Sequence, residues 1–149
     1  MVVKKEYEPI LPAGLHTMNL EKCKELCVNS FCGGQQRLFL YGNLCKYIGS
    51  LSKISVHFEI WIDGSFTTKK PEPNDIDIVI FAEENDISKL SGQKQGLLYD
   101  LINKPEVRKS YSIDIYFAVK NDLDIRSYWR GWFGFTRDEK PKGIIVLEV

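Results

Sequence analysis

Residues 75–82, DIDIVIFA, are the segment that most restricts how this chain can fold. Their β-branched and aromatic residues predict a β-strand, in which alternate side chains point to opposite faces. Asp75 and Asp77 therefore share one face at the start of the strand. Beyond them the residues are apolar on both faces, through Val79 and Phe81, so other parts of the chain must cover this strand on both sides.

Two other segments share the strand pattern. Residues 58–62 alternate between an apolar face and a face with Glu59, and the strand ends at the sequence Asp-Gly-Ser of residues 63–65. Residues 112–119, SIDIYFAV, predict a third strand with one aspartate near its start. The segment 66–74 between the first two strands is polar and contains two prolines, so we predict a loop there.

Helices are predicted where apolar residues recur at intervals of three and four. Asn19 is expected to cap the first helix and Asp86 the third. Gly92 and Gly96 weaken the middle of the third helix, and Pro105 is expected to end it. The predicted helices cover residues 20–28, 35–52, 87–103 (in one or two pieces) and 122–130.

Together these segments predict one α+β domain. The 149 residues of the chain match the size of a single domain. The mixed order of helices and strands predicts a mixed β-sheet with helices packed mainly on one face. Residues 1–17 are predicted to be an irregular lead-in, and residues 132–149 a C-terminal hairpin.

Charge and hydropathy exclude several classes of partner. The 20 basic and 20 acidic residues give a formal net charge of zero. Proteins that bind long nucleic acids usually carry a basic excess, so extended duplex DNA is not expected, whereas a tRNA end or a short RNA stays open. The longest apolar run, residues 78–82, is too short to span a membrane. The N-terminus lacks the apolar run of a signal peptide, so a cytoplasmic location is expected.

The four cysteines follow the spacing C-x3-C-x4-C-x12-C, which lacks the paired C-x2-C of structural zinc sites. Cys23 and Cys27 lie one turn apart on the first predicted helix. We expect buried free thiols that pack as small apolar side chains. A zinc site or a disulfide among the four is the less favoured alternative.

The paired aspartates are candidate metal ligands. Positions i and i+2 of a strand point to the same side roughly 7 Å apart, and two such carboxylates repel each other unless a cation lies between them. Mg²⁺ prefers oxygen ligands and binds one or two carboxylates together with substrate phosphates. Asp75 and Asp77 therefore suggest a site for Mg²⁺ or Mn²⁺. The alternative is a pair of solvated acids in a turn that begins at Pro73 and Asn74.

Asp114 is the third candidate ligand. It stands between two isoleucines, where an unpaired buried carboxylate is costly. If residues 112–119 pair with residues 75–82, Asp114 joins the same site, and three carboxylates on two strands suit two metal ions about 3.5–4 Å apart. The alternative is that Asp114 lies on an edge strand and is paired with Arg or Lys.

Gly64 and Ser65 suggest a phosphate-binding bend beside these acids. Glycine allows the backbone to approach a ligand closely. A turn at this point can direct amide groups and the Ser65 hydroxyl toward phosphate oxygens. The spacing and the lysine of a P-loop are absent.

The string IWIDGSFTTKKPEPNDIDIVI, followed by SIDIYFA, resembles the nucleotidyltransferase superfamily built on the DNA polymerase beta palm. The shared pattern is a strand, Gly-Ser, a short loop, Asp-x-Asp on the next strand and a third Asp on a following strand, and it covers residues 60–118. The segments LPAGLH and YWRGWFGFTRDEKPKGIIVLEV are also similar to short bacterial nucleotidyltransferase-like proteins, which extends the resemblance over most of the chain.

The resemblance implies transfer of a nucleoside monophosphate from a triphosphate, such as ATP, to a hydroxyl group, with release of pyrophosphate. Asp75 and Asp77 would be shared metal ligands. Asp114 would bind the catalytic metal and help to orient or deprotonate the acceptor hydroxyl. Gly64 and Ser65 would hold the β- and γ-phosphates.

This chain departs from the superfamily pattern in two ways. An arginine and a glycine that often follow Gly-Ser are replaced by residues 66–68, Phe-Thr-Thr. Lys69 and Lys70 are then the nearest cations, and Lys69 is assigned to nucleotide binding. The separate helical domain that selects the acceptor in many members is also absent, so a protein partner or a second subunit is expected to supply that function.

Two classes of function follow. The favoured one is an enzyme that modifies a protein, an RNA or a small molecule, and the resemblance implies a place in toxin–antitoxin or phage-defence systems. The alternative is a non-catalytic nucleotide-binding or antitoxin-like module with the same fold, although the intact set of three acids counts against it.

Basic and aromatic residues cluster near the C-terminus, at Arg126, Trp129, Arg130 and Trp132. Such side chains can stack on a base or hold phosphates. The favoured interpretation is that the tryptophans pack into the core and the arginines form a solvated face.

Overall fold

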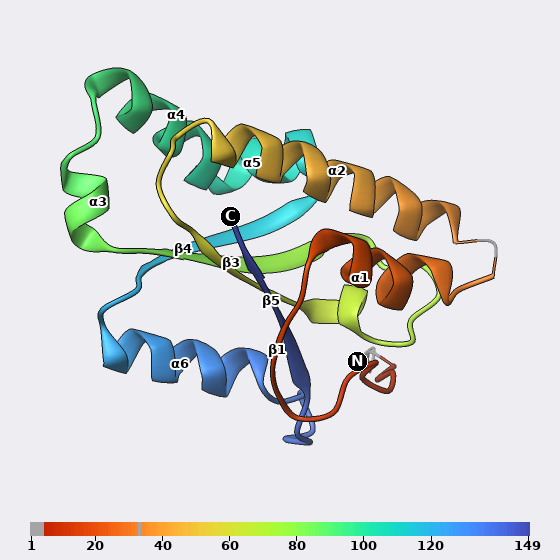
Figure 1. The fold of residues 1–149 in the computed structure, drawn as a ribbon. Coiled ribbons are helices and arrows are strands. Elements are labelled where there is room, and N and C mark those ends of the chain that lie inside the picture. The colour runs from red at the N-terminus through yellow and green to blue at the C-terminus, as the bar shows by residue number, and fades with distance from the viewer. Residues whose placement is uncertain (1–4, 33) are drawn as a thin grey trace.

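The computed structural model describes residues 5–32 and 34–149, and a five-stranded mixed sheet runs through its centre (Figure 1). The strand order is β1-β5-β2-β3-β4. β1 and β5 are parallel, as are β3 and β4, whereas β2 is antiparallel to both of its neighbours. The fold is therefore α+β, as predicted at this level. The strands are β1 (Gly14–Thr17), β2 (Glu59–Asp63), β3 (Ile76–Ala82), β4 (Ile113–Val119) and β5 (Gly143–Glu148).

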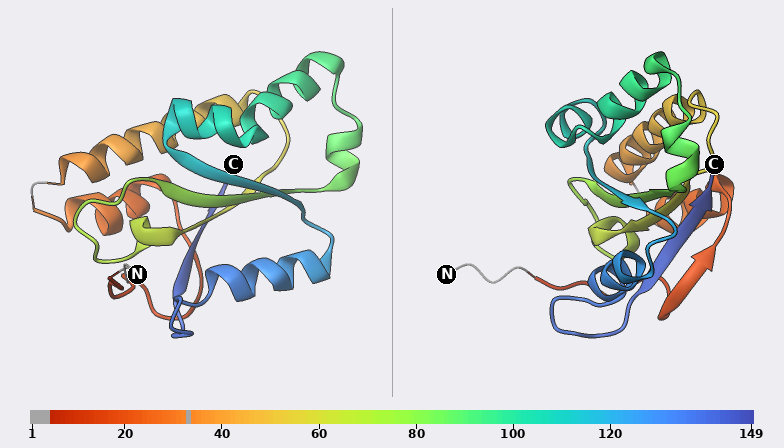
Figure 2. Two further views of the ribbon diagram at one scale, coloured as in Figure 1. Left: turned by 180° about the vertical axis from the view of Figure 1, so that it is seen from behind. Right: turned by 90° about the vertical axis from the view of Figure 1, so that its left-hand side faces the viewer.

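Most of the helices cover one face of this sheet, and α6 covers the other (Figures 1 and 2). The first group packs through Cys23, Leu44, Leu98 and Val107 against the isoleucines of the strands. Phe133 of α6 packs on the opposite face. The helices are α1 (Leu20–Lys24), the π-helical turn η1 (Glu25–Asn29), α2 (Gln35–Ser52), α3 (Glu84–Ser88), α4 (Gly92–Ile102), α5 (Lys104–Tyr111) and α6 (Leu123–Phe133).

The alternation predicted for β3 is confirmed by its two cores. Ile78 and Ile80 are fully buried in the larger cluster beneath α2 and α4. Val79 and Phe81 are equally buried in the smaller cluster beneath α6. Both faces of the strand are therefore covered beyond its first turn, which leaves the aspartates near its start at the rim of the α6 face.

The helix predicted to stop at Pro105 does end just before it, at Ile102, but the prediction missed that a new helix, α5, begins there. Pro105 lies in the first turn of α5, where its missing N–H would have no intrahelical acceptor in any case. Asn103 caps α5 by accepting from the N–H of Glu106. The predicted cap at Asp86 is wrong, because Asp86 lies inside α3, whereas Ser91 caps α4.

The two chain ends also differ from the prediction. The predicted irregular lead-in over residues 1–17 contains β1, which pairs with β5. The predicted hairpin over residues 132–149 does not form, because β5 pairs with β2 and β1, and only an isolated bridge joins Phe135 to Pro141. Residues 143–147 are all buried. An exposed hairpin would leave these mostly apolar side chains in water, whereas a place inside the sheet buries them.

Cys23 and Cys27 are buried as predicted, Cys32 is exposed, Cys45 is half-buried, and all four are free thiols. A hydrogen bond to Cys27, together with burial, raises the pKa of the Cys23 thiol far above its ordinary value. Within residues 5–32 and 34–149, no helix has the length and apolar character needed to cross a membrane.

Candidate active site

The strand register aligns three aspartates across the sheet. Asp63 of β2 lies opposite Asp77 of β3, and Asp77 lies opposite Asp114 of β4. Residues in register on neighbouring strands place their Cβ atoms roughly 4.5–5.5 Å apart on the same face. Asp75 joins this row from the position two residues before Asp77. The structure therefore brings Asp75, Asp77 and Asp114 together and adds Asp63.

The pKa of Asp77 is affected by burial and by the carboxylates that lie close to it. The pKa of Asp77 is raised to about 7. Burial is the largest cause, and the negative charges of Asp75, Asp114 and Asp63 contribute the next part of the shift. Burial also raises the pKa of Asp63, to about 6, although Lys142 opposes the shift. A carboxyl group with these properties attracts either a proton or a cation.

Gly64 is required beside Asp77 for two reasons. Its φ angle of 76° lies in the left-handed region, which glycine enters without strain. A Cβ atom at this position would also collide with the carboxylate of Asp77. The bend that follows, a 3-10 turn over Gly64–Thr67, therefore lies directly against the acid row.

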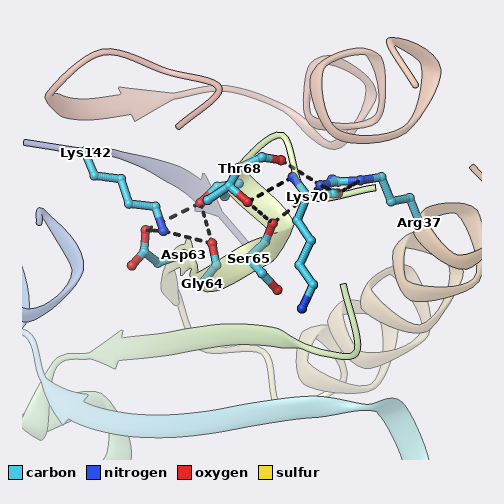
Figure 3. A network of polar contacts seen from close by, with 8 residues as sticks. Arg37, Asp63, Gly64, Ser65, Thr68, Lys70 and Lys142 are labelled. Carbon is cyan, nitrogen blue, oxygen red and sulfur yellow. Dashed lines mark hydrogen bonds and ion pairs between the residues drawn. The ribbon is translucent and has the colours of Figure 1, made fainter. Parts of the chain in front are cut away.

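Arg37 of α2 holds the segment after Gly64 from the side away from the acids. Its buried guanidinium donates to the carbonyl oxygens of Cys27 (2.9 Å), Phe66 (2.7 Å), Thr68 (2.6 Å) and Lys70 (2.6 Å). Figure 3 shows the hydrogen bonds from Arg37 to Thr68 and Lys70 at one end of the loop. Burial lowers the pKa of Arg37 from its ordinary value.

Lys142, just before β5, holds the opposite end of the same loop (Figure 3). Its ammonium group donates to the carbonyl oxygen of Gly64 at 2.8 Å and pairs with Asp63 Oδ1 at 3.2 Å. Both side chains are less than a tenth exposed. The charge of Asp63 is thus partly satisfied, which separates it from the other three acids.

Sequence reasoning missed Arg37, Asp63 and Lys142. Asp63 could have been found, because it follows Trp61 at strand spacing and so faces the same side as Asp77. Arg37 and Lys142 gave no signal, since their main partners are backbone carbonyl oxygens, which every residue carries.

Lys69, assigned to nucleotide binding, does not line the cleft. Its ammonium group pairs with Glu8 at 3.1 Å and its backbone N–H bonds to the Glu8 carbonyl oxygen. The next residue, Lys70, lines the cleft instead. Ser65 and Lys70 project to the same side of the loop in Figure 3. Of these two lysines, Lys70 is therefore the one that the structure places at the cleft.

The two outer acids are paired with basic residues of α5. Arg108 Nη2 lies 3.1 Å from Asp75 Oδ2, and Lys104 Nζ lies 3.4 Å from Asp114 Oδ1. Tyr116 also donates its hydroxyl to Asp114 Oδ2 at 3.1 Å. β4 is an edge strand, so the alternative considered for Asp114, an edge carboxylate paired with a basic residue, is present as well.

The donor set of the acid row consists of carboxylate oxygens, which suits hard cations such as Mg²⁺. Among the residues that the structure describes, no group of three or more His, Cys, Asp or Glu side chains is arranged ready to hold a metal ion. In this arrangement Asp75 and Asp114 instead pair with basic groups of the chain itself.

A cleft of about 1250 Å³ opens over the acid row. The acids and the Gly64–Lys70 loop line one part of it, and the end of α6 with the segment after it lines another. Trp132 and Phe135 contribute large exposed aromatic surfaces there. The basic side chains of the lining belong to Lys5, Lys70, Arg108, Arg137 and Lys142.

The C-terminal basic and aromatic cluster divides between packing and the cleft. Trp129 packs against Tyr116 and Phe133, with ring centroids 4.7 and 5.4 Å away. Arg126 forms a 2.5 Å ion pair with Glu59. Trp132 is 65% exposed and faces the cleft. The packing interpretation is therefore confirmed for Trp129 and wrong for Trp132.

One protein family matches this chain, over residues 4–148, and its description is "Family of unknown function (DUF6932)". No curated protein and no solved structure matches. The chemistry of the site must therefore be argued from its own residues.

Proposed function

We propose that this chain, which belongs to the family of unknown function DUF6932, is a Mg²⁺-dependent nucleotidyltransferase that moves a nucleoside monophosphate from a triphosphate to a hydroxyl acceptor. The observation that carries the proposal is the strand register that aligns Asp77 with Asp114 beside the Gly64 bend. The resemblance of residues 60–118 to the polymerase beta-like superfamily supports the same assignment.

Three of the four acids are the proposed metal ligands. Asp75, Asp77 and Asp114 offer carboxylate oxygens to the cleft, whereas Asp63 is already bound to Lys142. When bound, Mg²⁺ would neutralise negative charge on the triphosphate and on the leaving pyrophosphate. The raised pKa of Asp77 supports this. Burial is its largest cause and the neighbouring carboxylates add to it, and a bound divalent cation would offset both effects.

The loop supplies the proposed phosphate contacts. The Ser65 hydroxyl and the Lys70 ammonium group lie on the cleft side of the loop, while Arg37 holds its carbonyl oxygens on the other side. Groups fixed in this way need little reorganisation when they bind an anion. Ser65 and Lys70 would therefore hold the β- and γ-phosphates.

Asp114 would orient the acceptor hydroxyl and take its proton. The hydroxyl oxygen then forms a bond to the α-phosphorus, the bond from the α-phosphorus to the bridging oxygen breaks, and pyrophosphate leaves with that electron pair. The hydroxyl of Tyr116 bonds to Asp114 Oδ2 at 3.1 Å, which fixes the orientation of the carboxylate.

The test uses ATP, CTP, GTP and UTP, each labelled at the α-phosphate, with Mg²⁺ and with the protein itself, RNA or small alcohols as acceptors. We expect label transfer with at least one pair and a loss of about 100-fold or more in Asp77→Ala. Asp100→Ala, a matched change at an exposed position of α4, should keep full activity. Label transfer that persists unchanged in Asp77→Ala would contradict the proposal.

One observation favours a second candidate, a non-catalytic nucleotide-binding or antitoxin-like module. Asp75 and Asp114 are each paired with a basic residue of the same chain, as expected where acids serve the fold alone. Tight nucleotide binding that is unchanged by a chelator, with no turnover for any acceptor, would favour this module over the enzyme.

A further inference from the structure

Helix α5 carries two basic residues that reach the two outer acids. Lys104 and Arg108 are four residues apart and so lie on the same side of the helix. Lys104 pairs with Asp114 at 3.4 Å, and Arg108 pairs with Asp75 at 3.1 Å. One helix thus supplies a positive group to Asp75, two residues before Asp77, and to Asp114, opposite Asp77 on the neighbouring strand.

The acids and their partners differ in exposure. The side chains of Asp75 and Asp114 are 25% and 22% exposed, whereas those of Arg108 and Lys104 are 61% and 50% exposed. Ion pairs with one largely exposed partner are weak, and a long basic side chain that leaves such a pair returns readily to water. Lys104 also places its ammonium group 3.3 Å from the centroid of the Tyr116 ring, so it should leave its carboxylate less readily than Arg108 does.

We propose that Lys104 and Arg108 compete with the metal: they neutralise Asp114 and Asp75 when no metal is bound, and binding of a divalent cation displaces both. This inference rests on the proposed function. A divalent cation that binds several carboxylates at once outcompetes two separate weak pairs, but its affinity is lowered by the contacts that it must break.

Arg108 and Lys104 differ in where their side chains lie relative to the cleft. Arg108 lines the cleft and Lys104 does not. An arginine released beside the phosphate-binding loop can bind phosphate oxygens through two parallel hydrogen bonds. Metal binding would therefore free Arg108 for the triphosphate, which couples the binding of metal and nucleotide in a positive sense.

The first test measures the affinity of Mn²⁺ alone by isothermal titration calorimetry, in the whole protein without nucleotide. We expect Lys104→Gln and Arg108→Gln each to bind Mn²⁺ about 2- to 5-fold more tightly than the unaltered chain, and the double variant about 10-fold more tightly. Lys104→Arg and Arg108→Lys keep the charge and should change the affinity little.

A matched control comes from Lys69, another exposed lysine paired with a carboxylate, which lies outside the cleft lining. Lys69→Gln should leave Mn²⁺ affinity unchanged, and Asp77→Asn should abolish binding. If the unaltered chain binds Mn²⁺ through Asp77 but the Gln variants bind no more tightly, the competition is refuted while the proposed function stands. Absence of Mn²⁺ binding in the unaltered chain and in the double variant would refute both.

The second test separates the roles of the two residues. In saturating Mg²⁺, affinity for a nonhydrolysable ATP analogue should fall about 10-fold or more in Arg108→Gln and stay within about 2-fold in Lys104→Gln. Equal losses in both variants would show a general effect of positive charge near the site. Unchanged affinity in Arg108→Gln would show that the released arginine does not contact the nucleotide.

Discussion

The two walls of the cleft use charge in opposite ways. On the acid wall, formed by Asp75, Asp77 and Asp114 at the starts of β3 and β4, burial and then the like charges of neighbouring acids raise the pKa of Asp77. On the loop wall, residues 64–70, the buried Arg37 donates to carbonyl oxygens at one end and Lys142 donates to a carbonyl oxygen at the other (Figure 3). The buried charges of the acid wall therefore destabilise the fold, whereas those of Arg37 and Lys142 on the loop wall stabilise it.

This difference gives a criterion for separating structural from functional charges in one site. A buried charge whose hydrogen bonds are satisfied holds the fold, so its removal destabilises the protein. A buried charge surrounded by like charges is kept at the expense of stability, so a neutral replacement of the same shape should stabilise the protein. The two walls should therefore respond to neutral substitutions with opposite signs.

The largest effect is expected on the loop wall. Arg37→Met should lower the free energy of unfolding by about 3–5 kcal/mol, because several buried carbonyl oxygens lose their donor together. Urea unfolding measures the change, and Arg130→Met, at an exposed position of α6, should change it by less than about 0.5 kcal/mol. A loss below about 1 kcal/mol for Arg37→Met would show that the buried charge of Arg37 does not stabilise the loop wall.

The contact between the two walls comes next. Gly64→Ala should cost about 2–3 kcal/mol, because alanine is strained at a φ of 76° and its Cβ collides with Asp77. Gly96→Ala, at a helical position with open space around it, should instead stabilise by about 0.5–1 kcal/mol.

A double-mutant cycle isolates the collision with Asp77. In the Asp77→Ala background the cost of Gly64→Ala should be about 1 kcal/mol smaller, since the carboxylate is absent. If the two free-energy changes are additive, the cost of Gly64→Ala comes from backbone strain alone, and Gly64 and Asp77 are not energetically coupled.

The acid wall should show the opposite sign. Asp77→Asn should raise the free energy of unfolding by about 1–2 kcal/mol at pH 8, while it abolishes metal binding and nucleotidyl transfer. Burial and neighbouring acids raise the pKa of Asp77 from 3.8 to about 7 in the folded state. The folded state therefore holds this proton more tightly than the unfolded state does.

The sign of the pH dependence follows from that difference. In the unaltered chain without metal, stability should fall as the pH rises from about 4 to about 7, because over this range the unfolded state releases the Asp77 proton while the folded state still holds it. Asp77→Asn should flatten this decline, as measured by urea unfolding at several pH values. Destabilisation by Asp77→Asn at pH 8 would mean that the acid wall is not repulsive.

The smallest effect is expected at the exposed pair beside the loop wall. Lys69→Ala breaks a largely exposed ion pair with Glu8 and should change the free energy of unfolding by less than about 0.5 kcal/mol, with no effect on nucleotide affinity. Lys70→Ala should leave stability equally unchanged but weaken binding of an ATP analogue about 10-fold. A loss of nucleotide affinity in Lys69→Ala, with none in Lys70→Ala, would show that Lys69 and not Lys70 binds the nucleotide.

Much of the local structure could be predicted from the sequence, and the exceptions have identifiable causes. Period-two alternation identified β2, β3 and β4, and period-three-and-four spacing identified α2. Pro105 was interpreted as the end of a helix although it begins α5, because proline suits both places. This choice hid the helix that carries Lys104 and Arg108, and with it the basic partners of the acid row.

The sequence by itself determined which side of its own strand each aspartate occupies, because the direction of a side chain is set by the local backbone. Only the tertiary structure decided what each aspartate faces. The register sets Asp77 beside Asp114, and Arg108 reaches Asp75 from 33 positions along the chain. The neighbours of a buried charge depend on how whole elements pack, and that packing is decided by apolar surface far from the charge itself.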